Sequence, residues 1–298
     1  MPPISTILLG FLVPALATAF GLAAAWRVWD KSATVDGRWI GGPLFGLAFG
    51  MAFWNLRARP HFPPGTGDVI EWVFYLAVGL GILGLLDALV RPPIWLRAIG
   101  LLILWRLVIR VMLWPLIPGS LILWEEWIDF LGLAALAWWW SLETVTRESP
   151  GLAGPLLLLI LSIGAAAILT SWHIVGSATA AAGAAAICVA ATAAAAWRGR
   201  ISLERGAATA IALPLLALLI HGYFFTGDTL TPGQQFFAGL VLISPMLALA
   251  GDLPFAVKCR PHWRLAIRLL PVILAVGVAA AWSLHQYAQA DQVQQQDE

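Results

Sequence analysis

The stretch that decides the fold lies between residues 104 and 130 and reads LWRLVIRVMLWPLIPGSLILWEEWIDF. It consists of two apolar segments that meet at Pro118, Gly119 and Ser120, a combination of residues that is typical of a turn. Together with its flanking residues, each segment reaches the roughly 20 residues that a helix needs to cross a bilayer. The stretch therefore predicts two helices that fold back on each other as a hairpin.

Four charged residues occupy matched positions in this predicted hairpin. Arg106 and Arg110 lie four residues apart in the first helix, a spacing that puts them on one face. Glu125 and Asp129 have the same spacing in the second helix. If the helices are antiparallel about the turn, Arg110 lies level with Glu125. Arg106 then lies level with Asp129, so we expect two ion pairs between the helices.

The composition of the whole chain is that of a membrane protein. Of the 298 residues, 60% are hydrophobic and 11% are charged, and the mean hydropathy is +0.85. A soluble domain has about a quarter of its residues charged. The net charge of +1 gives no reason to expect nucleic-acid binding. The sequence therefore predicts an all-α integral membrane protein that is embedded in the lipid bilayer.

Apolar segments of spanning length recur along the chain, separated by short loops that contain proline and glycine. We expect ten transmembrane helices, at about 4–28, 39–56, 70–90, 94–116, 121–143, 152–173, 175–197, 206–225, 234–251 and 266–287. They would form one membrane domain, residues 1–288, with possible halves 1–149 and 150–288. The glutamine-rich tail, residues 289–298, is expected to be disordered.

The lysine and arginine residues predict the orientation in the membrane. Thirteen of them lie in or beside loops that follow odd-numbered helices, and two, Arg57 and Arg59, lie in loops that follow even-numbered helices. Cytoplasmic loops carry the excess of such residues. We therefore expect both termini on the outer, non-cytoplasmic side of a plasma membrane. The short loops suit the inner membrane of a bacterium.

The charges of the hairpin would lie well inside the bilayer. Counted from the turn at about 1.5 Å per residue, Arg106 and Asp129 lie roughly 17 Å deep in a core about 30 Å thick. A charged side chain costs about 2.5–3.5 kcal/mol at that depth, so these groups should face one another or water. Glu126 lies on a neighbouring face of its helix and is the carboxylate left without an arginine.

Charged residues inside a membrane often mark substrate or ion pathways. The favoured hypothesis is a transporter or permease for a small molecule or an ion, with no cofactor. Its site would comprise Arg106, Arg110, Glu125, Glu126, Asp129, His173 and His221. The first alternative is a non-catalytic membrane subunit or scaffold whose buried charges are structural ion pairs.

The histidines suggest a second alternative, because four of the five fall near the predicted outer face: His61, His173, His221 and His285. An intramembrane enzyme could use Glu125 or Glu126 together with a histidine there. That reading requires the two side chains to lie within hydrogen-bond reach of each other or of one water molecule. No HxxH or HxxxH spacing is present, so no metal site is expected.

Three glycines in the second predicted helix, Gly42, Gly46 and Gly50, form a smooth face for close helix packing. Two readings are open for this face: packing within the chain, or the seam of a homodimer.

Charged residues near the predicted inner face are expected to pair locally. Asp87 lies close in sequence to Arg91 and Arg97, which predicts a salt bridge or a helix cap. Glu143 and Arg147 are four residues apart and are expected to pair on one helix surface. Arg268 is counted with the loop cations at the edge of the last helix.

Overall fold

The computed structural model describes residues 4–26, 38–56, 61, 68–113, 121–149, 151–198, 203–226 and 230–296, and these residues form helices and turns with no strand. Ten of the described helices have 16 or more residues. They are α1 (Ile4–Trp26), α2 (Arg38–Leu56), α3 (Trp72–Val90), α4 (Ile94–Leu113), α5 (Leu121–Glu148), α6 (Ala153–Ser171), α7 (Val175–Arg198), α8 (Thr209–Thr226), α9 (Pro232–Leu247) and α11 (Pro261–Gln296). Short elements join some of them: η1 (Val69–Glu71), η3 (Ala248–Asp252) and α10 (Pro254–Val257).

Seven of the described helices are long and apolar enough to cross a membrane, namely α1, α3, α6, α7, α8, α9 and α11. The apolar part of α2, Ile40–Leu56, is shorter. The helices α4 and α5 are not among the seven because charged residues interrupt them. The chain thus has the helices of a multi-span membrane protein, whereas ten crossings and the side of the termini stay predictions.

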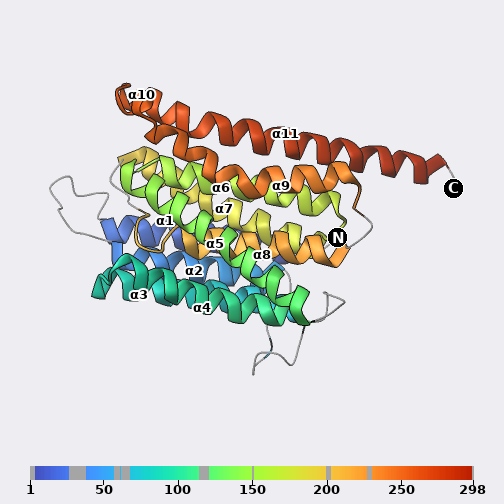
Figure 1. Cartoon of the computed structure of the whole chain (residues 1–298), viewed down its shortest axis with the longest axis horizontal. Helices are drawn as coiled ribbons and strands as arrows, with labels where there is room; N and C mark the ends of the chain where they lie inside the picture. Colours follow the sequence, from blue (N-terminus) through green and yellow to red (C-terminus); the bar gives the residue numbers. More distant parts are fainter. Residues whose placement is uncertain are drawn as a thin grey trace.

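The centre of the bundle is α8, in which every side chain from Thr209 to Gly222 is buried. It contacts each helix from α2 to α7 (Figure 1). A helix that is apolar on all sides needs such complete surroundings, because no face of it prefers water.

Peripheral helices flank this centre on two sides. On one side α11 packs against α6 and α9, and on the other side α3 and α4 form the edge of the bundle (Figure 1). The chain begins and ends toward the same end of the bundle (Figure 1). The helix α11 continues to Gln296, through most of the tail that the composition suggested would be disordered.

The glycine face of α2 packs against α3 of the same chain. A Cβ atom at Gly42 would lie 2.9 Å from the Cα atom of Gly84, and one at Gly46 would lie 2.6 Å from the carbonyl oxygen of Ala77. Only glycine permits so close an approach of two backbones. The packing within the chain therefore occupies this face, and a homodimer through Gly42, Gly46 and Gly50 would require α3 to move away.

Candidate functional site

The predicted ion pairs between α4 and α5 are present. The Arg106 Nη1 atom lies 2.9 Å from Asp129 Oδ1, and the Arg110 Nη2 atom lies 3.8 Å from Glu125 Oε1. Arg106 also donates a hydrogen bond to Glu125, so its guanidinium group joins both carboxylates. We call Arg106, Arg110, Glu125 and Asp129 the charge ladder.

The charge ladder lies on the outside of the bundle and not in its core. The exposed fractions of the four side chains are 51% for Arg106, 53% for Arg110, 37% for Glu125 and 65% for Asp129. The exposed residues around them are apolar: Ile103, Leu107, Trp127, Phe130 and Leu133. A face that is otherwise suited to lipid therefore carries charges in the C-terminal half of α4 and the N-terminal part of α5.

Glu126 is exposed beside the charge ladder. It forms no ion pair with the residues that the structure describes. The five charges of this face thus comprise three carboxylates and two guanidinium groups.

A cleft of about 300 Å³ lies next to the ladder, between α4 and α5. Arg106 and Asp129 form its polar edge, and the other residues that line it are Leu102, Trp105, Ile128, Gly132, Leu133 and Leu136. The indole nitrogen of Trp105 is buried and has no hydrogen-bond partner among the described residues. The cleft is therefore apolar, with one donor available.

The two histidines predicted for this site have other surroundings. His173 is exposed at the turn after α6, where its φ is 58°, and its ring lies 5.0 Å from that of Tyr287. His221 is buried in α8, and its ring stacks on that of Phe225 at 5.8 Å. No hydrogen bond or ring contact among the described residues joins either histidine to the carboxylates of α5.

A different histidine pairs with a carboxylate. The Nδ1 atom of His61 lies 2.8 Å from Glu71 Oε1, and its backbone N–H donates to Glu71 Oε2 at 2.9 Å. The Tyr75 hydroxyl donates to the carbonyl oxygen of His61. Glu71 is buried at the end of η1, directly before α3, so this contact holds His61 against the end of the bundle.

The opposite end of the bundle, where α3 and α5 end, holds buried and partly buried charges. Arg97 of α4 lies 2.8 Å from Asp87 Oδ2 of α3 and 2.9 Å from Glu143 Oε1 of α5. Its guanidinium carbon also lies 5.4 Å from the centre of the Trp139 ring, within cation–π range. Asp87 therefore forms a salt bridge with Arg97, one of the two arginines predicted for it. Glu143 also pairs with Arg97, and the predicted pair with Arg147 is not formed.

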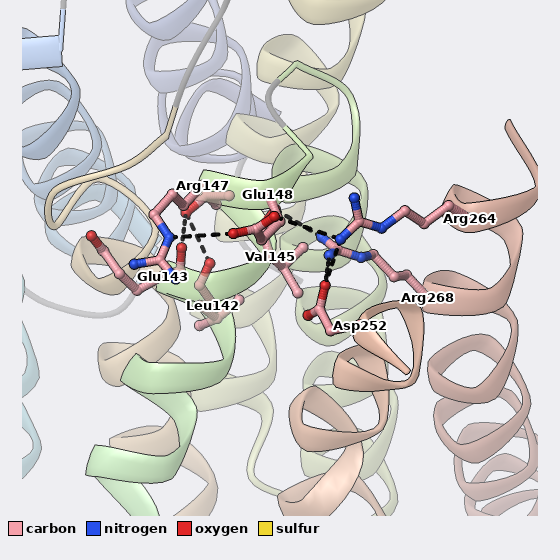
Figure 2. Close-up of polar contacts among 9 residues, drawn as sticks. Leu142, Glu143, Val145, Arg147, Glu148, Asp252, Arg264 and Arg268 are labelled. Carbon is pink, nitrogen blue, oxygen red and sulfur yellow. Dashed lines mark hydrogen bonds and ion pairs between the residues drawn. The ribbon is translucent and has the colours of Figure 1, made fainter. Parts of the chain in front are cut away.

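A second buried network joins α5 to α11 (Figure 2). Arg268 is 0% exposed, donates to the carbonyl oxygen of Val145 at 3.2 Å, and pairs with Asp252. Arg264 donates to the same Asp252 oxygen at 2.8 Å and lies 3.6 Å from Glu148. Figure 2 shows the Glu148 and Asp252 carboxylates facing these two guanidinium groups. Arg268 is thus an internal cross-link, not the loop-edge cation that its position suggested.

Gly251 makes room for this arginine. A Cβ atom at Gly251 would lie 2.0 Å from Arg268 Cγ and 2.4 Å from its Nε atom. The sequence contains one indication of this network: Arg264 and Arg268 are four residues apart, on one helix face, and follow an aspartate, Asp252, that could pair with them. It cannot show that α11 begins at Pro261 and turns both arginines inward.

Among the described residues, no group of three His, Cys, Asp or Glu side chains is placed to hold a metal ion. Besides the Glu71–His61 pair, the ion pairs among the described residues form three sets: the exposed ladder, the Arg97 cluster and the Arg268 network. No protein-family model matches the chain, and no curated protein matches its sequence.

Proposed function

We propose that this chain is a ten-span membrane subunit that binds another membrane protein through the outer face of α4 and α5. The observation that carries the proposal is the exposure of the charge ladder on a helix face whose other exposed residues, apart from Glu126, are apolar. Of the three functional readings of the sequence, the membrane subunit is the one that this position supports best.

In a bilayer, the outer face of α4 and α5 would meet lipid hydrocarbon and not water. A charged side chain in the middle of a bilayer costs about 2.5–3.5 kcal/mol on insertion scales. Pairing within the ladder offsets part of that cost, but the outward side of each group would still face hydrocarbon. A neighbouring protein helix that covers the ladder would replace hydrocarbon with polar or charged partners.

The excess of carboxylates indicates the chemistry of the partner. Glu126 has no ion-pair partner among the described residues, and intramembrane carboxylates pair with cationic side chains. The partner would carry a lysine or arginine in its spanning helix at the depth of Glu126. An apolar side chain of the same helix would fill the cleft beside Gly132.

Transport through the ladder has less support. Its cleft opens on the outside of the bundle and is lined mainly by apolar side chains, which suits a protein or lipid contact better than a hydrated pathway. An enzyme built on Glu125 or Glu126 lacks a histidine in hydrogen-bond contact with either carboxylate among the described residues.

A site-specific cross-link tests the proposal. A photoreactive amino acid at Leu133, which is 66% exposed beside the ladder, should form an adduct with a membrane protein in native membranes. The same group at Phe20 of α1, which is 71% exposed on another face, is the matched control and should give no such protein adduct.

The identity of the adduct and its dependence on charge decide the outcome. Glu126→Gln should reduce the Leu133 adduct roughly tenfold, the effect of losing about 1.4 kcal/mol. The partner should contain a basic residue in a spanning helix. In a charge exchange, a Glu126→Lys variant of this chain should lose the adduct, and a partner whose basic residue is changed to glutamate should restore it. An adduct with lipid alone, or one unchanged in Glu126→Gln, would refute the proposal.

Cysteine labelling tests the ten spans and the outward termini. Cys259 is exposed in the segment between α10 and α11, and Cys188 is buried. With ten crossings, Cys259 lies inside, so a membrane-impermeant maleimide should label it only after the membrane is opened. A Gln289→Cys variant that also lacks Cys259 should be labelled in intact cells. Labelling of Cys259 in intact cells would contradict the topology.

A further inference from the structure

A second cavity, unrelated to the charge ladder, lies between α3 and α4 near the end of the bundle that holds Arg97. Its volume is about 410 Å³, within the range of small-molecule sites. Its polar end is formed by Asp87 and Arg97, and Trp139, Gly206 and Thr209 also line it.

The polar end contains a buried acceptor that lacks a donor. The Asp87 side chain is 8% exposed, and its Oδ2 atom pairs with Arg97. Neither Asp87 oxygen has a hydrogen-bond partner among the described residues, and Oδ1, unlike Oδ2, makes no ion pair with them either. Buried carboxylate oxygens are almost always satisfied, so this atom calls for a hydrogen-bond donor from the cavity.

The other end of the cavity is apolar and opens on the outside of the bundle. Its rim is formed by exposed aliphatic side chains of α3 and α4: Leu86, Val90, Leu96, Ile99 and Ile103. Gly100 lies on the same wall, and a Cβ atom there would meet nothing within 4 Å. The absence of a side chain at this position keeps the cavity continuous with the surface that lipid would cover.

The charges near Asp87 favour a neutral ligand head. Asp87 and Glu143 carry two negative charges, and Arg97 supplies one positive charge between them. Arg205 also attracts Asp87. The cluster is therefore close to balanced, and an anionic head would meet two carboxylates.

We propose that this cavity binds a lipid with a neutral hydroxyl head, such as a monoacylglycerol, with the hydroxyl donating to Asp87 and the acyl chain lying between α3 and α4. The inference does not depend on the partner of the charge ladder. Each proposal can fail while the other stands, because they involve different cavities, different charged groups and different assays.

Two photoreactive probes of the same chain length test this site in the full chain, in lipid nanodiscs. One is a monoacylglycerol and the other is a free fatty acid, each with a diazirine near the end of the chain. The monoacylglycerol should label α3 and α4 about ten times more than the fatty acid does, and unlabelled monoacylglycerol should compete. Equal labelling by both probes, or none by either, would overturn the proposal.

A matched pair of glycine variants tests whether the labelled site is the cavity between α3 and α4. Gly100→Phe should reduce monoacylglycerol labelling to the level of the fatty acid, because the ring fills the cavity. Gly277→Phe is the control, since a Cβ atom at Gly277 in α11 also meets nothing within 4 Å and this residue lines no described cavity. Labelling that persists in Gly100→Phe would overturn the proposal. If Gly100→Phe does not fold, the competition in the wild-type chain still decides.

Discussion

The charge ladder and the Arg268 network use the same residue types in opposite surroundings. Arg106 pairs with two carboxylates at the surface of the bundle, where 51% of its side chain is exposed. Arg268 pairs with Asp252 and with a backbone carbonyl of α5, and none of its side chain is exposed. Arg268 is enclosed by the chain, whereas the ladder presents its outward side to whatever lies beside the bundle.

This difference shows what each set of charges contributes. A buried arginine that donates to Asp252 and to a carbonyl oxygen of α5 fixes the position of one helix against another. An exposed ladder contributes little to the stability of an isolated chain, since exposed ion pairs are worth about 0.2–1 kcal/mol in water. Its position in a membrane face is better explained by an external contact.

Removing the buried arginine should have the largest effect. Arg268→Ala would leave Asp252 with only Arg264 and would open a void against α5. Breaking a buried pair costs about 3–5 kcal/mol, so we expect little folded protein from membranes. The measurement is the yield of monodisperse protein and its thermal unfolding in detergent. Lys258→Ala, an exposed cation in the segment before α11, should match the wild type. A normal yield of Arg268→Ala would show that the network is not a structural cross-link.

Crowding the same arginine should have a smaller effect. Gly251→Ala places a Cβ atom 2.0 Å from Arg268 Cγ, so the arginine must shift away from Asp252. Overpacking of this kind costs about 1–3 kcal/mol. Gly277→Ala is the matched control, because its Cβ atom meets nothing. Thermal unfolding of both variants measures the difference, and equal melting temperatures would argue against tight packing at Gly251.

Neutralising the ladder should have the smallest effect on the isolated protein. Arg106→Gln combined with Asp129→Asn removes the two exposed pairs that Arg106 makes with Asp129 and Glu125, so the unfolding free energy in detergent should change by about 0.2–1 kcal/mol for each pair. The same double variant should weaken the Leu133 cross-link in native membranes. A loss of stability as large as that of Arg268→Ala would erase the contrast between the two regions and assign the ladder a structural role.

The sequence predicted local features well because they depend on spacing along one helix. The ten helices lie close to their expected positions, and the pairs Arg110–Glu125 and Arg106–Asp129 follow from the four-residue spacing and the turn between the helices. Among the described loops, Pro92 and Pro93 separate α3 from α4, and Pro232 begins α9, at two of the expected breaks between helices. These features need only the period of the helix and the reversal of the chain.

The direction of each charged face could not be predicted in this way. Glu143 pairs with Arg97 because the start of α4 lies beside the end of α5. Arg147, four residues after Glu143, has the spacing expected of a partner on the same helix but pairs with Glu148. The burial of Arg268 depends on Gly251 and on the carbonyl of Val145, which lies 123 residues away. Such contacts arise from the packing of helices that are distant in sequence.

The sequence by itself determined that this chain is a helical membrane protein with a charged hairpin between residues 104 and 130. Composition and helical period decide these properties, because each depends only on a residue and its near neighbours. Only the tertiary structure decided that the hairpin turns its charges outward while Arg97 and Arg268 turn inward. The physical reason is that a helix buries the face that its neighbours cover: α3 and α5 cover Arg97, and α5 and η3 cover Arg268.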